Sequence, residues 1–243
     1  MNTPNVKRMA FFALLCAALT TTSGTASAAT VDEHASTWSG YLDQGATFTD
    51  VVATWTQPAI TCTVPTARAS FWIGFDGFGN GTVEQVGTIG TCMGAGRPVV
   101  YRGWWEMVAS SGNRGGEPIA VVPGDRIVAS VRYRSGAYVL DVRDATSGAH
   151  FKVTKPCTVV CARSMAEWIV ERPGSGTYPL ARFGKFEFTG AKAKAVAPVA
   201  HGGISMFPQT LRLTMENKGT VLSRPGRLTS GGTAFRCHWR AAE

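Results

Sequence analysis

The chain has 243 residues and a formal net charge of +8 at pH 7, from 24 Lys and Arg against 16 Asp and Glu. Charged residues make up only 16% of the chain, Gly is abundant, and a tenth of the residues are aromatic, a composition that suits a turn-rich extracellular β protein. The basic residues are scattered and no nucleic-acid-binding motif occurs, so no nucleic-acid partner is expected. We interpret the positive charge as serving solubility or adhesion to acidic cell-wall polymers.

Residues 1–28 have the features of a secretory signal peptide. Lys7 and Arg8 precede an apolar run from Met9 to Leu19, and Ala26-Ser27-Ala28 is a small-x-small cleavage site. The run is too short to span a bilayer, and no later segment is apolar over a sufficient length. We therefore expect a secreted, extracellular monomer without a membrane partner.

The remaining chain, residues 29–243, contains five cysteines, which cannot all pair within one molecule. In an oxidising compartment Cys62 and Cys92 are the first choice for a disulfide, because they flank a compact aromatic segment. Cys157 and Cys161 can close a short loop, which would leave Cys237 as a free thiol. A zinc site is disfavoured, because Cys157-x-x-x-Cys161 has no nearby His partner.

Segments of alternating polarity, separated by turn residues, follow one another along the chain. No segment after the signal peptide has a helical period for more than two turns. The expected strands are Phe48–Thr56, Ser70–Phe75, Thr82–Gly87, Val99–Val108, Arg126–Arg134, Ala137–Val142, Met165–Glu171, Arg182–Phe188, Thr210–Met215 and Ala234–Trp239.

Three further features complete this prediction. Ser135-Gly136 and Ser147-Gly148 mark hairpin turns. The stretch "GAKAKAVAP" has period two and is predicted to be an edge strand with Lys192 and Lys194 pointing outward. No linker long enough to separate domains occurs, so residues 29–243 are expected to form a single all-β domain, an antiparallel β-sandwich of two stacked sheets, concanavalin-like or jelly-roll-like.

Most hydrolytic chemistries lack their sequence motifs here. No H-E-x-x-H pattern, G-x-S-x-G elbow or phosphate-binding glycine motif occurs, and an aspartic peptidase would need a second Asp-Thr/Ser-Gly loop. A Ser-His-Asp triad is not excluded by residue order alone. We expect no metal and no cofactor.

The stretch "MAEWIVERP" raises a specific question about its two carboxylates. Side chains alternate along a strand, so Ala166, Trp168 and Val170 face one way, whereas Glu167, Ile169 and Glu171 face the other. Desolvation by the adjacent Trp168 indole would raise the pKa of Glu167 and make it a better general base or acid than a surface Glu.

A neutral amide stands on another expected strand. Gln85 in "VEQVG" shares its face with Val83 and Gly87, and a Gln amide can donate to a developing oxyanion at any pH. Trp72, Gly74 and Asp76 likewise share a face, and Trp104, Trp105 and Glu106 form an aromatic and acidic cluster. Taken alone, an inward Glu or Gln is more often a satisfied polar group of the core than a catalytic residue.

Four motifs together make a more specific pattern. "FWIGFDG", "TVEQVGT", "GWWEM" and "MAEWIVERP", in this order and spacing, resemble the eqolisin-type glutamic peptidases. The resemblance runs from about Trp38 to about residue 190, and "PGDRIVASVRY" matches the central hairpin of that family.

The resemblance implies a catalytic dyad on the concave face of two stacked antiparallel sheets. Gln85 matches the Gln of the dyad and Glu167 matches its Glu. Glu167 would deprotonate the attacking water and later protonate the leaving nitrogen, while Gln85 would orient the water and stabilise the oxyanion. The implied activity is that of an endopeptidase acting on protein or peptide substrates at acidic pH.

Other residues of these motifs are implied as groove-lining or supporting residues: Trp72, Asp76, Trp105 and Glu106. Two positions depart from the fungal members, which have additional acidic residues in the groove: this chain has Ile89 after "QVGT" and Arg102 before "GWWE".

Two other functions remain as alternatives. A carbohydrate-binding or catalytically inactive β-sandwich would bind without turnover and give Gln85 and Glu167 no special role. A glycoside hydrolase would use Glu167 and Glu171 as a carboxylate pair, although the middle position, where such enzymes usually have a further acid, is Ile169.

Overall fold

The computed structural model describes residues 29–108, 112–157 and 161–243. The proposed signal peptide lies outside the described residues. The structure is a β-sandwich of two stacked layers, with one short 3₁₀ turn, η1 (Ser230–Gly232), in the described parts of the chain. The all-β prediction is confirmed. No helix in these ranges is long and apolar enough to cross a membrane.

The larger layer carries the strands of the four motifs. In spatial order it contains β7 (Arg114–Ala120), β6 (Val99–Val108), β5 (Val83–Cys92), β4 (Arg68–Phe75), β11 (Met165–Glu171), β2 (Trp38–Gln44), β14 (Gln209–Asn217), β15 (Thr220–Pro225) and β16 (Phe235–Trp239).

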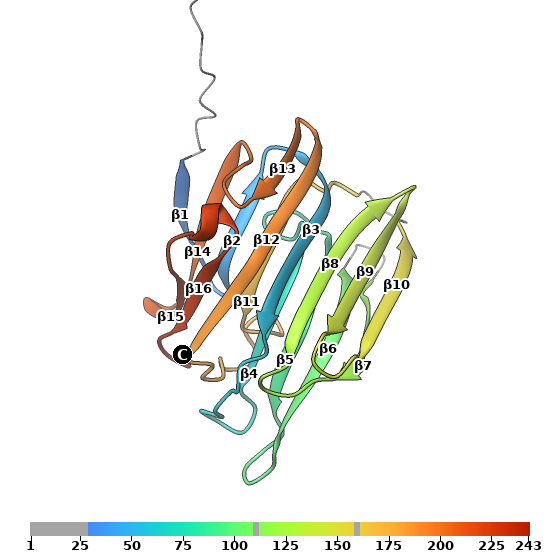
Figure 1. Ribbon diagram of the computed structural model, residues 1–243. Coiled ribbons are helices and arrows are strands. Elements are labelled where there is room, and N and C mark those ends of the chain that lie inside the picture. The colour runs from blue at the N-terminus through green and yellow to red at the C-terminus, as the bar shows by residue number, and fades with distance from the viewer. Residues whose placement is uncertain (1–28, 109–111, 158–160) are drawn as a thin grey trace, which may run out of the picture.

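The smaller layer lies in front of β4, β5 and β6 in Figure 1. It contains β10 (His150–Pro156), β9 (Ala137–Asp144), β8 (Arg126–Arg134), β3 (Thr47–Thr56), β12 (Lys185–Ala197) and β13 (Val199–Gly203). Strand β12 belongs to both layers, because its first residues pair with β16 and its later residues pair with β3.

The structure differs from the sequence-based prediction in several ways. Six strands have no counterpart among the expected ones: β1 (Thr30–Ala35), β2, β7, β10, β13 and β15. The segment "GAKAKAVAP" is not an edge strand, because the chain folds back after it and β13 pairs with residues 192–196 on the side away from β3. Lys192 and Lys194 are nevertheless exposed, as expected. The sheet is also not wholly antiparallel, because β1 runs parallel to β14.

The core lies between the two layers, where the inward residues of facing strands meet. Trp55 and Phe188 pack with their ring centroids 5.6 Å apart. The Trp55 indole also donates a 3.0 Å hydrogen bond from β3 to the Thr88 hydroxyl on β5. Burying these large aromatic side chains supplies the main driving force for the stacking of the layers.

The predicted disulfide between Cys62 and Cys92 is present and ties the end of β5 to the loop after β3. Cys157 and Cys161 form the second disulfide. Cys237 is the free thiol, buried on β16. All three outcomes agree with the pairing favoured by the sequence.

A second, smaller apolar cluster covers the outer face of the larger layer. Its buried members are Leu42, Trp72, Ile169, Leu211 and Leu213, with Trp38, Phe78, Trp104 and Met165 packed against them. The central strands of this layer are therefore buried on both faces. A groove on this outer face contains Gln85 and Glu106, two of the residues singled out from the sequence.

Candidate active site

Four residues of the sequence motifs lie in one row across the larger layer, three of them polar. Glu167 on β11 stands opposite Gly74 on β4, Gly74 stands opposite Gln85 on β5, and Gln85 stands opposite Glu106 on β6. Directly opposed residues project to the same face of a sheet, so the three polar side chains share the outer face. The strands that carry them are far apart in the sequence, and only the sheet brings them together.

Gly74 determines what lies between Glu167 and Gln85. A Cβ atom at this position would lie 3.0 Å from Cβ of Gln85 and 2.6 Å from the carbonyl oxygen of Glu84. Because Gly74 has no side chain, nothing on β4 projects between the carboxyl and the amide. Two strand spacings separate β11 from β5, about 9–10 Å between backbones, which leaves room for a small group between the two side chains.

The Gln85 side chain is held by its neighbour on β6. Its Nε2 donates a 3.0 Å hydrogen bond to Oε2 of Glu106, and Oε1 of Glu106 accepts a 3.4 Å bond from Asn113. Gln85 Oε1 is buried and has no hydrogen-bond partner among the described residues. One of the two Nε2 hydrogens is therefore engaged by Glu106, while the second Nε2 hydrogen and the Oε1 acceptor are left for another group.

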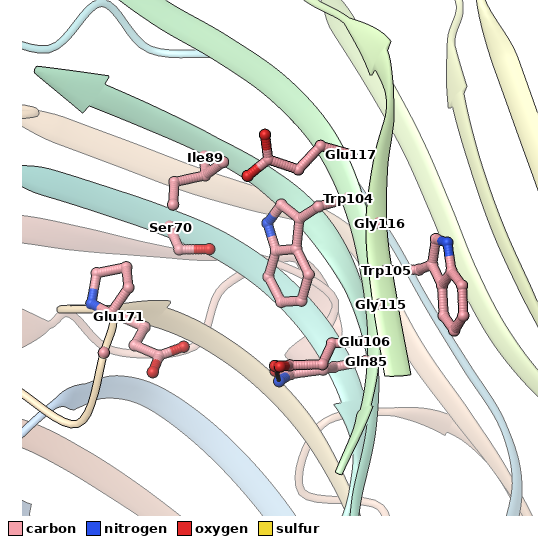
Figure 2. Close-up of a pocket in the computed structure, with 12 residues that line it drawn as sticks. Ser70, Gln85, Ile89, Trp104, Trp105, Glu106, Gly115, Gly116, Glu117 and Glu171 are labelled. Atoms are coloured by element: carbon pink, nitrogen blue, oxygen red, sulfur yellow. Dashed lines mark hydrogen bonds between the residues drawn. The ribbon is translucent and has the colours of Figure 1, made fainter. Parts of the chain in front are cut away.

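Two adjacent cavities of about 360 and about 580 Å³ form the groove, and both are lined by Gln85, Glu106, Glu171 and Gly174. The first extends along β5 and β6 to Ile89 and Glu117, and the second extends to Trp38 and Phe78. Figure 2 shows Gln85 and Glu106 side by side on one wall of the first cavity and Glu171 on the other. The pair of cavities forms an extended site along β5 that could hold a chain-like ligand.

Glu167 lies beneath this groove rather than on its surface. Its side chain is fully buried, and neither carboxyl oxygen has a hydrogen bond of good geometry within the part of the chain that the structure describes. Burial, reinforced by the negative charge of Asp76, raises the pKa of Glu167 well above 4.5. The peptide N–H of Phe78 lies close enough to oppose part of this rise.

The predicted cause of this desolvation is wrong in one respect. The Trp168 indole points to the core, where it donates a 3.0 Å hydrogen bond to the Val52 carbonyl on the smaller layer. The apolar groups on the face of Glu167 are Leu42, its cross-strand neighbour on β2, and Ile169, with Phe78 packed against this cluster.

Glu171 also lies on the outer face, two residues after Ile169 on β11. Its Oε2 accepts a 2.7 Å hydrogen bond from the Trp72 indole, and Trp72 packs edge-on against Trp38 at 5.0 Å. Burial raises the pKa of Glu171 to about 7, against the effect of the hydrogen bond from Trp72. Trp72 is itself fully buried, and its indole N–H holds the Glu171 carboxyl in the groove.

Asp76 does not line either cavity. It follows the last residue of β4 with φ of +60°, so the alternation of the strand stops there. Its carboxylate accepts bonds from the backbone N–H groups of Arg163 at 2.7 Å and Ser164 at 2.9 Å. Asp76 therefore joins the loop after β4 to the chain entering β11.

Trp104 and Trp105 lie on opposite sides of β6. Figure 2 shows the Trp104 indole directed into the first cavity and the Trp105 indole on the other side of the strand. Trp105 packs against the main core and beneath Lys155. The sequence motif names both residues, but strand alternation from Glu106 selects Trp104 as the residue on its face.

The positions that depart from the fungal pattern are also placed. Ile89 lines the first cavity and stands opposite Arg102 on β6, whose side chain does not line either cavity. No group of three or more His, Cys, Asp or Glu residues is arranged to hold a metal ion within residues 29–108, 112–157 and 161–243.

Comparisons with known proteins agree with this architecture. The model of the Peptidase A4 family matches residues 36–231, which extends beyond the resemblance recognised in the sequence. Among curated protein sequences, none matches the chain significantly.

Solved structures of similar fold are glutamic peptidases. Scytalido-glutamic peptidase, solved with a transition state analog inhibitor, is similar with a TM-score of 0.68 and 20% identity, over 84% of this chain and 98% of that one. SCP-B, a member of the eqolisin family, was solved with the tripeptide Ala-Ile-His and gives 0.63 and 19% over the same shares. Aspergilloglutamic peptidase from Aspergillus niger gives 0.58 and 25%, over 72% of this chain and 99% of that one.

The family model covers most of the chain, and the fold is that of solved family members. The chain therefore belongs to the Peptidase A4 family of eqolisin-type glutamic peptidases and is a hydrolase of peptide bonds.

Proposed function

We propose that this protein is a secreted endopeptidase that hydrolyses peptide bonds at mildly acidic pH through Glu167 and Gln85. The observation that carries the proposal is the row in which Glu167 and Gln85 face the same side of the sheet with only Gly74 between them. Secretion is supported by the signal-like segment and by the two disulfides, which persist in oxidising compartments.

In the proposed reaction, a water molecule lies between the Glu167 carboxyl and the Gln85 amide, next to the scissile carbonyl of the substrate. Ionised Glu167 takes a proton from this water as its oxygen attacks the carbonyl carbon. Gln85 stabilises the tetrahedral oxyanion as a neutral hydrogen-bond donor, which needs no protonation change. Protonated Glu167 then gives the same proton to the leaving nitrogen as the C–N bond breaks.

The burial of Glu167 suits both halves of this cycle. A carboxyl with a raised pKa is a stronger base when ionised, and it remains a competent acid once protonated. Access to Glu167 requires that Phe78, which packs over the same face, move when substrate enters the groove.

The proposed substrate is an extended peptide lying along β5. The two cavities join end to end past Gln85, and a peptide in this position would present one carbonyl to the row while neighbouring residues occupy the cavities on either side.

Substitution of the dyad tests the proposal. Glu167→Gln should abolish turnover of denatured casein without changing the thermal transition, because an amide cannot take the proton from water. Gln85→Ala should lower kcat by about 10²–10³ or more, the scale of losing one oxyanion donor. Gln85→Glu should also fail, since a second carboxylate would repel the oxyanion.

Retention of more than a few per cent of activity by Glu167→Gln would contradict the assignment. Inhibitor classes give an independent check: pepstatin, serine-directed phosphonates, thiol alkylators and EDTA should all leave activity intact. Loss of activity to EDTA with recovery on adding zinc would replace the proposed chemistry by metal catalysis.

A further inference from the structure

The outer face of the smaller layer, on the opposite side of the sandwich from the groove, is strongly basic. Seven Lys and Arg side chains and two Asp side chains project from its pairing rows, a net of five positive charges against +8 for the whole chain. Lys185 and Glu187, at the start of β12, line a cavity of the same face with Arg126 and add one charge of each sign. The basic residues of the rows are Lys192 and Lys194 on β12, Arg126, Arg132 and Arg134 on β8, Arg143 on β9 and Lys152 on β10.

These side chains form an ordered array because of the strand register. One row across five strands reads Lys192, Val52, Ser130, Asp141 and Lys152. Neighbouring strands are about 4.8 Å apart, and residues of one face repeat every ~6.7 Å along a strand. The cations are thus held at fixed spacings over a broad face rather than at one point.

The carboxylates of this face already have partners, and Glu187 forms its ion pair with Arg236 at 3.3 Å. Asp50 forms ion pairs with Arg134 at 2.5 Å and Arg132 at 3.6 Å, and Asp141 lies 3.1 Å from His150. Five cations of these rows have no carboxylate within ion-pair distance in the part of the chain that the structure describes: Arg126, Arg143, Lys152, Lys192 and Lys194. Five positive charges therefore have no ion-pair partner.

A shallow cavity of about 320 Å³ lies in the middle of this face. Its lining includes Thr54 and Ser130, whose hydroxyl groups can hydrogen-bond a ligand, and the side chains of Arg132, Asp141 and Arg143. The face thus combines a depression with hydroxyl groups and cations around it.

The side chains of this face favour one kind of polyanion. The pairing rows of this face contain no outward aromatic residue on β3, β8, β9, β10 or β12. The face therefore lacks the aromatic side chains on which the bases of single-stranded nucleic acids stack. Hydroxyl side chains between cations match a ligand that carries both hydroxyls and repeated negative charges. A linear anionic polysaccharide has this chemistry.

We propose that the outer face of the smaller layer, formed by β12, β3, β8, β9 and β10, binds a linear anionic polysaccharide. Binding there leaves the groove open, because the groove lies on the outer face of the other layer. The enzyme would be retained at an acidic cell-wall or matrix polymer while its groove faces solvent.

The test compares two variants of equal charge. The first replaces Arg126, Arg143, Lys152 and Lys192 with Gln. The matched control replaces four exposed cations away from this face: Arg97, Lys218, Arg227 and Arg240. Affinity for polygalacturonate, a linear polymer with one carboxylate per sugar, is measured by calorimetry over a range of salt concentrations, with dextran as the neutral polymer.

We expect the wild type to bind polygalacturonate but not dextran, with affinity that falls as salt rises. The first variant should bind at least ~10-fold more weakly and with a shallower salt dependence, since it makes up to four fewer ionic contacts. The control should change by less than about threefold. Hydrolysis of a soluble peptide should be the same for all three proteins.

Equal losses in the two variants would overturn the proposal, because binding would then follow net charge and not this face. Absence of wild-type binding to polygalacturonate would also overturn it. Tighter binding to single-stranded DNA or to anionic vesicles than to polygalacturonate would show that the face has a different occupant. None of these results depends on whether Glu167 and Gln85 are catalytic.

Discussion

Gln85 and Glu106 face each other on neighbouring strands, and Nε2 of the Gln85 amide donates a 3.0 Å hydrogen bond to Oε2 of Glu106. Because an ionised carboxylate can only accept hydrogen bonds, it must meet the amide nitrogen, and this contact fixes which end of the amide faces β6. Glu106 is therefore a positioning residue for the proposed oxyanion donor.

Glu106→Ala should lower kcat by about 10-fold to 10²-fold with a smaller effect on KM, because Gln85 would lose its fixed orientation. Glu106→Gln should restore much of kcat, since its carbonyl can accept the same hydrogen bond. Glu117→Gln is the matched control, because Glu117 lines the same cavity but, within the described residues, forms no hydrogen bond with Gln85. Steady-state kinetics that give equal losses for Glu106→Ala and Glu117→Gln would reject a specific role for Glu106.

The acid limb of the pH profile reports Glu167. Its pKa is raised well above 4.5, so the ionised base form becomes abundant only at higher pH, and kcat/KM should rise with pH through a value above 4.5. Phe78→Ala would admit water to the carboxyl and shift this limb to lower pH, whereas Phe78→Leu keeps the apolar cover and should not. An acid limb at or below pH 4.5 in the wild type would contradict the burial of Glu167 in the free enzyme.

The alkaline limb is assigned to Glu171. Burial raises the pKa of Glu171 to about 7. Glu171 lines the same two cavities as Gln85, so its ionisation places a new negative charge in the groove. This charge would oppose the oxyanion, so activity should fall as pH rises through about 7. Glu171→Gln is neutral at every pH and should remove this limb while keeping the hydrogen bond from Trp72. A limb that persists unchanged in that variant belongs to another group.

Two buried carboxyls outside the groove predict how stability depends on pH. Burial raises the pKa of Asp43 to about 7, although Thr210 donates a 2.6 Å hydrogen bond to it, and burial with the charge of Asp76 raises that of Glu84 to about 8. Between the unfolded and folded pKa values the native state holds more protons than the unfolded state, so the free energy of unfolding falls as pH rises.

The protein should therefore be most stable near or below pH 4 with respect to these two groups, and should lose a few kcal/mol by about pH 8. Glu84→Gln and Asp43→Asn retain the neutral shape and should each flatten the dependence of Tm on pH. Scanning calorimetry from acidic to mildly alkaline pH checks this. A Tm that rises between pH 5 and pH 8 would show that these carboxyls ionise freely in the folded state.

Local patterns in the sequence predicted which residues share a strand face. Alternation placed Glu167, Ile169 and Glu171 together and Gln85 with Val83, and the pairing register agrees. The same rule would have chosen Trp104 over Trp105 as the neighbour of Glu106, but the motif alone does not distinguish the two indoles. The Cys62–Cys92 disulfide was predicted from secretion and from the position of the two residues around an aromatic segment.

Strands β1 and β12 were harder to predict. Strand β1 is exposed along most of its length, so it has no apolar period and is stabilised by pairing with β14 and by ion pairs such as Asp32–Arg212. Strand β12 was predicted as two pieces, because its break in alternation near Gly190 is a bulge within one long strand.

By itself, the sequence determined the class of fold, which side chains share a face within β5 and β11, and the identity of the chemical groups, because the two-residue period of a strand is a local property of the backbone. Only the tertiary structure decided that β11 pairs with β4 and β4 with β5, which aligns Glu167, Gly74 and Gln85 although Gln85 and Glu167 are separated by about 80 residues of chain. It also decided that Trp168 faces the core while Leu42, Ile169 and Phe78 surround Glu167. Strand order and register are set by the burial of side chains from distant segments, and no local pattern contains that information.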